Sequence, residues 1–505
     1  MLSVDYQTSD TRNESATAIQ DRGLKFLLLI PDGVGIRNFL CSQFIDHLLR
    51  AGEVIVWHAL APASLAPYRE RWGAQVTWVA LPSYREGLSA RVLRQAKMYG
   101  QLYWKREAGL QIMLKFMRPS GRWLNYGIAY LARALGWLGS SPAGVRVLDN
   151  WHATAASWAG QLVPYTHFLA QQKPDVVFCT TQRASRAVPA MLAARQLGIP
   201  TSTFVYSWDN LPKGRMAVHA DHFVVWSDFM QQELRSYYPE IAADRIHVAG
   251  TPQFEHYFNP TLVQPRAAFL SSLGLDPARP VICFSGCDLT SSPHDPVYLA
   301  DLAAALRELP PAQRPQILFR RTPVDTSPRY QWVFEQYPEI AVSTPVWSAG
   351  RDNDWTQVIP TIADIALLVN VVRHADAVVN VGSTMAMDFA ILDKPGIYLA
   401  YNPPGVGPAS GWSVHDAYRL PHFRLVHELQ PIHWVRRVED LSSTVLHVLA
   451  NPQETAPARQ AWLTKLMAQP LAEASLRCCA TLQRIGRAAA AGRVDRSPHR
   501  KQGRD

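Results

Sequence analysis

Residues 374–401 read HADAVVNVGSTMAMDFAILDKPGIYLAY, and this stretch decides the fold class. The apolar run at 378–381 is typical of a buried parallel strand, and a second such run follows at 396–400. Between the two runs, a tight turn at 382–384 begins a short helix, which ends before Pro395. A strand, a helix and a second strand in this order indicate an α/β fold with a parallel sheet.

The turn at 382–384 also predicts a phosphate site. It lies at the carboxyl edge of the sheet, where the unpaired N–H groups and the positive dipole end of the helix converge. Gly382 keeps the turn tight, and the hydroxyls of Ser383 and Thr384 add donors for phosphate oxygens. We therefore expect a nucleotide diphosphate here. The alternative is that Ser383 only caps a structural helix, as serine commonly does.

Size and composition point to a soluble protein of more than one domain. The chain has 505 residues, too many for one core, and 48% of them are hydrophobic. No apolar stretch reaches the roughly 18 residues that a membrane-spanning helix needs. Residues 1–21 are polar and lack the layout of a secretory signal, so we expect a cytoplasmic location. The six cysteines show no paired metal-ligand spacing, which favours core thiols over a metal site.

Strand-like runs recur in both halves of the chain, and a Pro-rich segment separates the halves. We expect two Rossmann-like domains that face each other across a cleft. The predicted strands of the first half lie at 25–31, 54–58, 76–80, 175–180, 201–206, 222–225 and 245–248. The predicted organisation is a disordered N-terminus at 1–21, a first domain at 22–258, a hinge at 259–280, a second domain at 281–452, C-terminal helices at 453–487 and a disordered basic tail at 488–505.

A basic helical insertion interrupts the first domain at about 88–140. Residues 91–133 contain nine Lys and Arg residues against the lone Glu107, interleaved with Trp, Tyr and Phe. This composition favours contact with an anionic membrane surface, which would make the protein peripheral at the inner membrane face. Ordinary packing and nucleic acid binding are the alternatives. No nucleic-acid-binding motif accompanies the charge, so we expect no nucleic acid partner.

Three loops of the first domain follow predicted strands and are expected to reach the cleft. The first, at 32–38, contains Asp32 and Arg37. The second, at 206–216, concentrates hydrogen-bonding groups beyond the needs of a turn, although a structural turn is the alternative. The third, at 248–254, is either an ordinary loop or a phosphate or sugar site. The candidate acceptor-binding residues are Arg37, Trp208, Asn210 and Lys213, and the third loop adds Gly250 and Thr251 as candidate donor-binding residues.

Several of these motifs resemble a known enzyme class. The segments SWDN at 207–210, VWS at 225–227 and GTPQF at 250–254, together with 373–402, look like the two-Rossmann-domain glycosyltransferases called GT-B, especially those that build bacterial surface polysaccharide. Ser383, Thr384, Asp388 and the run AILDKP at 390–395 also look like the donor-binding segment of CDP-glycerol glycerophosphotransferases. The resemblance implies a donor nucleotide on the second domain, an acceptor on the first, and no metal.

The sequence also departs from these families. Glycerophosphotransferases carry an Arg-x-His-Pro turn, whereas residues 320–323 read RRTP. UDP-sugar 2-epimerases share the architecture but have a Gly-Gly pair followed by a glutamate, which GSTM at 382–385 does not match. The spaced glutamate pair of many retaining GT-B enzymes is absent as well. The stereochemical outcome therefore stays open.

Sugar transfer needs two kinds of group. Arg320 or Arg321, with the turn at 382–384, would stabilise the charge on the leaving nucleoside diphosphate. Asp32 or Asp209 would be the catalytic base of an inverting reaction, with Glu255 and His256 in reserve. Asp388 would hold a ribose hydroxyl. Each acid also has a structural alternative: Asp32 as a helix cap, Asp209 as a tie within its own loop, and Asp388 as a surface helix acid.

The sequence therefore predicts a glycosyltransferase that moves a sugar from a nucleotide-sugar donor to a hydroxyl of a surface glycan or lipid-linked acceptor. No metal and no cofactor is expected. One alternative is a nucleotide-activated polyol-phosphate transferase of the CDP-glycerol type. An alternative of another class is a non-catalytic GT-B-like subunit that binds a glycan or a nucleotide.

Overall fold

The structure is a computed structural model that describes residues 23–117, 123–158, 160–348 and 358–494. The predicted disordered N-terminus at 1–21 lies outside the described residues. The predicted disordered tail at 488–505 is wrong for its first residues, because a helix continues to Val494. The rest of the tail is outside the described part.

Seven parallel strands form the first sheet, in the order β3-β2-β1-β4-β5-β6-β7. Alternate residues of the central strand β1 enter two different cores: Phe26 and Leu28 pack on one face, and Leu27 and Leu29 on the other. Both faces are therefore buried, which explains the nearly continuous apolar runs. The strands are β1 (Leu24–Ile30), β2 (Gly52–His58), β3 (Val76–Ala80), β4 (Val176–Cys179), β5 (Thr201–Phe204), β6 (His222–Val225) and β7 (Ile246–Val248).

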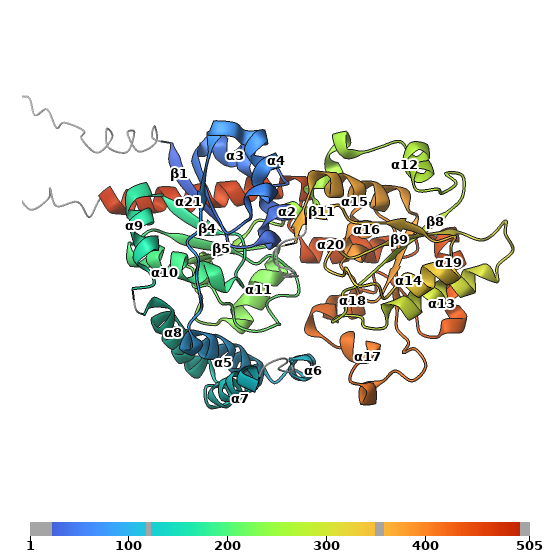
Figure 1. Cartoon of the computed structure of the whole chain (residues 1–505), viewed down its shortest axis with the longest axis horizontal. Coiled ribbons are helices and arrows are strands. Elements are labelled where there is room, and N and C mark those ends of the chain that lie inside the picture. Colours follow the sequence, from blue (N-terminus) through green and yellow to red (C-terminus); the bar gives the residue numbers. More distant parts are fainter. Residues whose placement is uncertain (1–22, 118–122, 159, 349–357, 495–505) are drawn as a thin grey trace, which may run out of the picture.

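Helices cover both faces of this sheet, as the alternating core requires (Figure 1). One face packs residues of α2 (Ile36–Phe39), α3 (Phe44–Ala51), α4 (Pro62–Trp72) and α11 (Asp228–Tyr237). The other face packs residues of α9 (Val163–Gln172) and α10 (Val188–Gln196).

Six parallel strands form the second sheet, in the order β10-β9-β8-β13-β14-β15. They are β8 (Val281–Ser285), β9 (Gln316–Arg320), β10 (Ala341–Ser343), β13 (Ala377–Asn380), β14 (Gly396–Leu399) and β15 (His433–Val435). The edge strand β15 and a short antiparallel pair, β11 (Trp347–Ser348) and β12 (Ile359–Pro360), were not predicted. The helices are α12 (Arg266–Ser272), α13 (Asp295–Arg307), α14 (Gln331–Gln336), α15 (Ile362–His374), α16 (Met385–Ile391), α17 (Val414–Ala417), α18 (Arg424–Leu429) and α19 (Leu441–Ala450).

The predicted α/β class with two Rossmann-like domains of GT-B type is confirmed. Figure 1 shows the two sheets in separate halves of the molecule, the first in blue and green and the second in yellow and orange. The predicted hinge at 259–280 contains α12. Arg266 of that helix donates to the carbonyl of Pro277 (3.1 Å) and to the carbonyl of His374, so this segment packs on the second domain.

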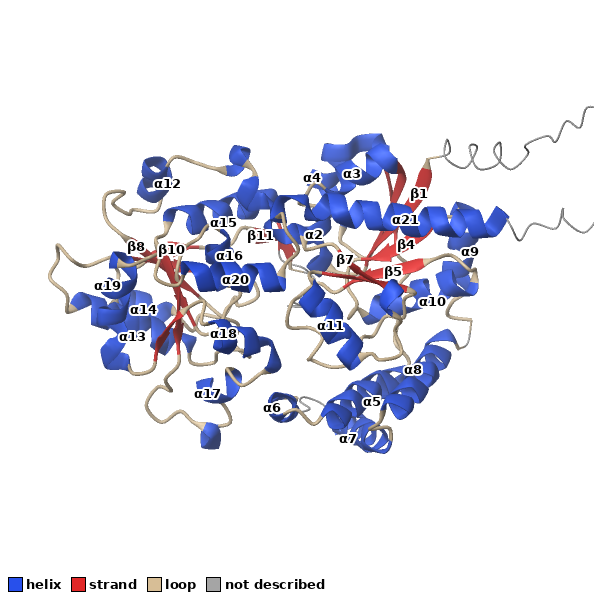
Figure 2. Cartoon of the chain, turned by 180° about the vertical axis from the view of Figure 1, so that it is seen from behind, coloured by secondary structure: helices blue, strands red, loops and turns tan. Residues whose placement is uncertain are grey.

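The C-terminal helices connect the domains a second time. After α20 (Ala456–Leu466), which packs beside α16 and α18, the chain returns to the first domain as α21 (Ala474–Val494). Figure 2 shows α21 lying along β1 and β4. The Ser475 hydroxyl donates to Glu255 (2.7 Å), and Arg477 donates to the carbonyl of Ala249 (3.0 Å). The last helix is therefore fastened to the first domain.

The insertion is a helical bundle on one side of the first domain (Figure 1). Its helices are α5 (Leu88–Lys105), α6 (Ala108–Phe116), α7 (Trp123–Leu138) and α8 (Pro142–Ser157), so the helical region continues beyond the predicted end at about 140. Helices α7 and α8 both pack on α5. Gly136 permits the close contact, because a Cβ there would lie 2.7 Å from the carbonyl oxygen of Ala96.

Several of the basic residues counted in the insertion serve packing instead of facing outward. Lys97 is fully buried and pairs with Asp149 (2.8 Å). Burial lowers the pKa of Lys97, and the Asp149 carboxylate opposes that lowering. Arg94 binds Glu86 with two hydrogen bonds (2.7 and 2.9 Å). The packing alternative is therefore correct for these residues. Among the described residues, no helix combines the length and the apolarity that crossing a bilayer requires.

Candidate functional site

A cavity of two neighbouring chambers lies between the domains, beyond the carboxyl ends of strands from both sheets. The larger chamber has a volume of about 710 Å³ and the smaller one about 210 Å³. Both are lined by Arg37, Ser207, Trp347, Thr384 and Asp388. Because they share these walls, the chambers form one continuous site to which both domains contribute.

Three loops of the second domain form the polar wall of the larger chamber. They follow β8, β9 and β13, and they contribute Ser285 to Thr290, Arg320 to Val324, and Ser383 to Met385. This is the edge at which ligands bind in open parallel sheets.

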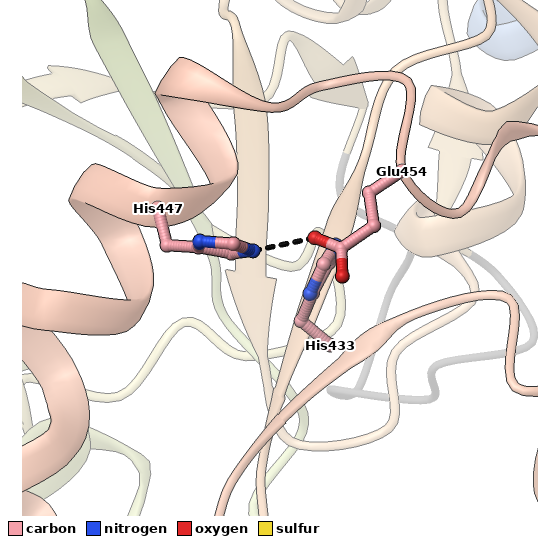
Figure 3. A group of neighbouring side chains, drawn as sticks. All are labelled: His433, His447 and Glu454. Carbon is pink, nitrogen blue, oxygen red and sulfur yellow. Dashed lines mark hydrogen bonds and ion pairs between the residues drawn. The ribbon is translucent and has the colours of Figure 1, made fainter.

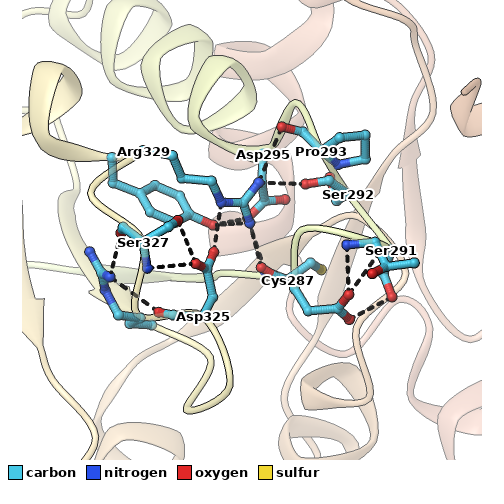
Figure 4. Close-up of polar contacts among 12 residues, drawn as sticks. Cys287, Ser291, Ser292, Pro293, Asp295, Asp325, Ser327 and Arg329 are labelled. Carbon is cyan, nitrogen blue, oxygen red and sulfur yellow. Dashed lines mark hydrogen bonds and ion pairs between the residues drawn. The ribbon is translucent and has the colours of Figure 1, made fainter. Parts of the chain in front are cut away.

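Arg329 fixes the loop after β8 in place. Figure 4 shows its guanidinium donating to the carbonyls of Cys287 (2.6 Å) and Ser292 (2.7 Å) and pairing with Asp325 (2.6 Å). Asp295 accepts from the Cys287 backbone N–H (2.9 Å). Burial raises the pKa of Asp295 to about 6. The loops after β8 and β9 are thus tied to each other before any ligand arrives.

The turn at 382–384 is positioned as the sequence predicts. Gly382 has φ +67°, and a Cβ there would lie 2.7 Å from the Phe423 ring, so only glycine fits. The Ser383 hydroxyl accepts from the Met385 N–H (3.3 Å) and lies 3.4 Å from the Ser285 hydroxyl. The N-cap of α16 is Thr384, so Ser383 is not the capping residue of the structural alternative; its hydroxyl only accepts from the first helical N–H, and both residues line the larger chamber.

The adjacent residues Arg320 and Arg321 have different environments. Arg320 is buried and binds both carboxylate oxygens of Asp364, at 2.7 and 2.9 Å. Arg320 lines the larger chamber, but its charge is already paired with Asp364, so its role toward a leaving group stays a prediction. Arg321 donates to the carbonyls of Asp325 (3.1 Å) and Ser327 (2.9 Å). No carboxylate partner is seen for Arg321 within the described ranges, so its charge is available to the larger chamber that it lines.

Asp388 joins the two domains at the centre of the cavity. It is buried, and one carboxylate oxygen accepts from the Tyr257 hydroxyl (2.7 Å) and from Arg37 (3.3 Å) of the first domain. Burial raises the pKa of Asp388, although Arg37 and Tyr257 oppose that rise. It is not the surface acid of the structural alternative. The ribose contact stays a prediction.

The two predicted catalytic acids do not line either chamber in the described structure. The Asp32 carboxylate accepts from the Val34 N–H (3.1 Å) and caps a 3₁₀ turn at Gly33–Gly35. Asp209 pairs with Lys213 and accepts from the Ser207 hydroxyl (2.6 Å) and from Asn210 (2.9 Å). The structural alternative thus describes both acids, and their role as bases has no support in this geometry.

Of the predicted acceptor residues, Arg37 and Trp208 line the cavity. Asn210 and Lys213 do not line either chamber. Both side chains bind Asp209 within their own loop, and the Asn210 side-chain oxygen also accepts from Gln182 (3.0 Å).

The predicted donor residues Gly250 and Thr251 also lie elsewhere. Gly250 packs against Arg477 and Ala474 of the returning C-terminal helix, and Thr251 is buried. The reserve candidate Glu255 is bound to Ser475. Burial lowers the pKa of the second reserve candidate, His256, to about 4.

Sequence reasoning missed several residues that complete the site. Tyr206, Ser207 and Trp347 line both chambers, and Tyr257 contacts Asp388. Tyr206, Ser207 and Tyr257 lie within or beside the loops already singled out, so loop position could have found them. Trp347 lies on the two-residue strand β11, which is too short to produce a strand pattern in the sequence.

Comparisons with known proteins support the fold. No family model matches the chain, and no curated protein matches its sequence. Solved structures do match: a UDP-GlcNAc 2-epimerase from Methanocaldococcus jannaschii has a TM-score of 0.51 at 12% identity, covering 91% of this chain and 100% of its own. The S. aureus MnaA–UDP structure and a candidate UDP-N-acetylglucosamine 2-epimerase from Listeria monocytogenes each have a TM-score of 0.50 at 10% identity, covering 91% of this chain and 96% of theirs. The chain thus has a GT-B-like fold.

The two arginines give a prediction about stability. Arg320→Met leaves Asp364 buried without its partner, which costs about 3–5 kcal/mol of unfolding free energy. Arg321→Met removes bonds to two carbonyls and a cation–π contact with the Tyr330 ring, and it is expected to cost about 1–2 kcal/mol. Urea unfolding of both variants measures the difference. Equal destabilisation by the two substitutions would contradict the separate environments described above.

Proposed function

We propose that the protein transfers a sugar from a nucleotide-sugar donor to a hydroxyl acceptor. The observation that supports this proposal most is the two-chamber cavity between the domains. The larger chamber offers polar groups suited to a nucleoside diphosphate, namely Arg321, Ser383 and Thr384. The smaller chamber extends under the first domain between Trp208, Trp226 and Phe254, whose flat rings suit the face of a sugar acceptor. Transfer needs such a second compartment, whereas rearrangement of one nucleotide sugar does not.

The leaving group is stabilised from the second domain. As the bond between the anomeric carbon and the phosphate oxygen breaks, the nucleoside diphosphate takes the electron pair and gains negative charge. Arg321 and the two hydroxyls of the turn face that charge in a partly buried cavity, where a cation and donors stabilise it more than they would in water.

Asp388 is positioned to accept the acceptor's proton. It is the carboxylate that lines both chambers and touches both domains. Its raised pKa makes it a stronger proton acceptor than an exposed aspartate. In an inverting transfer, the acceptor oxygen attacks the anomeric carbon while its proton moves to Asp388. This role replaces the ones first given to Asp32 and Asp209.

Epimerisation of a nucleotide sugar is the second candidate function. It is favoured by the likeness to the UDP-GlcNAc 2-epimerases of Methanocaldococcus jannaschii and Listeria monocytogenes. The likeness concerns the fold alone, and the turn sequence GSTM at 382–385 differs from the glycine pair and glutamate of that family. Transfer of an activated polyol phosphate and a non-catalytic binding role remain the other proposals of the sequence.

The activity test separates transfer from epimerisation. The protein is incubated with UDP-, GDP-, CDP- or dTDP-sugars in D₂O, with and without a mixture of glycan acceptors. We expect nucleotide release that depends on acceptor and no deuterium in the sugar ring, as followed by NMR. Acceptor-independent change of the sugar at C2 with deuterium uptake would establish epimerisation instead.

Asp388→Asn tests the proposed base, and Asp209→Asn is its matched control. The side-chain oxygen of the substituted amide can still accept from the Tyr257 hydroxyl. The Asp388→Asn variant should keep nucleotide affinity and lose roughly 10²-fold or more in turnover, as expected for a base. Asp209→Asn should retain turnover near the wild-type level. The opposite ranking of the two variants would return the base to the loop at 206–216.

Nucleotide affinity tests the turn directly. Ser383→Ala combined with Thr384→Ala removes two charge-assisted hydrogen bonds and is expected to weaken binding by about 2–4 kcal/mol. Isothermal titration calorimetry with the nucleotide that gives the largest thermal shift measures this loss. Ser442→Ala with Ser443→Ala on α19 is the control and should bind normally. Unchanged affinity in the folded double variant would remove the turn from the site.

We also propose that the insertion attaches the first domain to an anionic membrane, through α7. Residues 123, 130 and 137 are Trp, Tyr and Trp, and the residues that follow them are all Leu. Seven residues span two helical turns, so these six side chains form two rows along one face. Trp123 is 83% exposed, Tyr130 62% and Trp137 67%.

Charge favours lipid over a protein partner for this surface. Residues 88–158 contain ten Lys and Arg residues and two acids, Glu107 and Asp149, and Asp149 is already paired with Lys97. Exposed Trp and Tyr rings on a basic helical surface are typical of the interface between headgroups and acyl chains. A membrane location would bring the acceptor domain close to lipid-linked acceptors.

Vesicle flotation tests this attachment. The wild type should float with anionic but not with neutral vesicles, and less so in high salt. Trp123→Ala with Tyr130→Ala and Trp137→Ala should lower binding roughly tenfold or more, since each buried ring is worth roughly 1.5 kcal/mol or more. Trp332→Ala, an exposed Trp of the second domain, is the control. The proposal that α7 contacts lipid would be refuted if the wild type does not bind vesicles or if the triple variant binds them equally well. Light scattering that shows dimerisation through α7 would refute it as well.

A further inference from the structure

Two histidines and a glutamate meet on the second domain, away from the cavity. His433 lies on the edge strand β15, His447 on α19, and Glu454 in the connection between α19 and α20. Figure 3 shows the three side chains pointing toward one another. One ligand atom from each residue lies within 4.8 Å of the others, and in the described part of the chain no other group of His, Cys, Asp and Glu does so.

Two hydrogen-bonding features make this group unusual. The Nε2 atom of His433 is buried and has no hydrogen-bond partner among the described residues, which is a costly arrangement for a polar atom. The Nε2 atom of His447 lies 2.5 Å from Glu454 and makes an ion pair if protonated. The ion pair alone would explain His447 and Glu454, but it leaves His433 unexplained. A ligand shared by all three residues accounts for both observations.

We propose that His433, His447 and Glu454 bind a divalent transition-metal ion, with Zn²⁺ as the ion that best fits their chemistry. Two imidazole nitrogens and one carboxylate oxygen are a common ligand set for this ion, and water completes its coordination. Ligand atoms at about 2.0–2.2 Å from a tetrahedral ion are roughly 3.3–3.6 Å apart. His447 and Glu454 are about half exposed, so their side chains can make this adjustment.

The surroundings indicate a structural role for the ion. The ligands come from the outer strand of the second sheet, from the end of α19 and from the segment that leads into α20. Arg459 of α20 is buried and binds Asp393 (2.8 Å) at the end of the turn that follows α16. An ion held by the three ligands would fasten α19 and the start of α20 to the sheet edge. The spacing of these residues in the sequence does not indicate the site, because its ligands come from a strand, a helix and a connection that only the fold brings together.

The test uses the full chain after treatment with a chelator. Titration calorimetry with Zn²⁺ should show one ion bound per chain, with an accompanying rise in Tm, and Mg²⁺ should not compete because it prefers oxygen ligands. Substitution of Co²⁺ adds a visible absorption spectrum that reports nitrogen and oxygen ligands. We expect His433→Gln, His447→Gln and Glu454→Gln each to lower Zn²⁺ affinity tenfold or more and to reduce the rise in Tm.

Matched controls guard against binding at unrelated histidines. His167→Gln and His415→Gln change histidines far from the three ligands in the sequence and should leave the affinity unchanged. A wild-type chain that binds no Zn²⁺, or one whose affinity is the same in all three ligand variants, would overturn the proposal. If a ligand variant is too unstable to titrate, the Co²⁺ spectrum of the remaining two variants decides the question by the same criterion.

Discussion

The contact of Asp388 with Arg37 and Tyr257 joins the two domains at the wall that both chambers share. A buried carboxylate is costly unless it is paired, and here both partners come from the opposite domain. Separating the domains would leave Asp388 and Arg37 without each other. The contact therefore favours the closed arrangement, in which the two chambers share a wall. It also places Asp388, rather than Asp32 or Asp209 on the first domain's loops, in the wall of both chambers.

The local structure around the candidate site could be predicted from the sequence, because it depends on local geometry. The turn at 382–384 follows from a strand, a glycine and a helix start within a few residues, and the structure has each of them. The fold class was equally accessible, since alternating strands and helices specify parallel sheets through short connections. Loop position also placed Arg37, Trp208 and Arg321 at the cavity.

The incorrect assignments depend on partners that are distant in the sequence. Arg320 does line the larger chamber, but its charge is paired with Asp364, 44 residues further on, which its own position in the sequence does not reveal. Gly250 was expected in the site, but a helix that begins at Ala474 covers it. The sequence counts Lys97 among the surface charges of the insertion, whereas its side chain is buried and paired with Asp149. Residue type and spacing indicate what a side chain can do, and only the fold shows which long-range partner already occupies it.

The insertion connects the membrane proposal to the cavity. Helix α6 lies against the second domain: a Cβ at Gly109 would be 2.4 Å from the carbonyl oxygen of Arg419 and 2.7 Å from Pro421. The neighbouring Phe423 packs under Gly382, at the predicted phosphate turn. The next helix of the insertion is α7, which carries the exposed Trp and Tyr side chains. If a bilayer holds α7 as proposed, it would hold a bundle that contacts both domains. An enzyme whose acceptor is lipid-linked would gain from this arrangement, because the cavity would be held in a fixed orientation to the surface that supplies the acceptor.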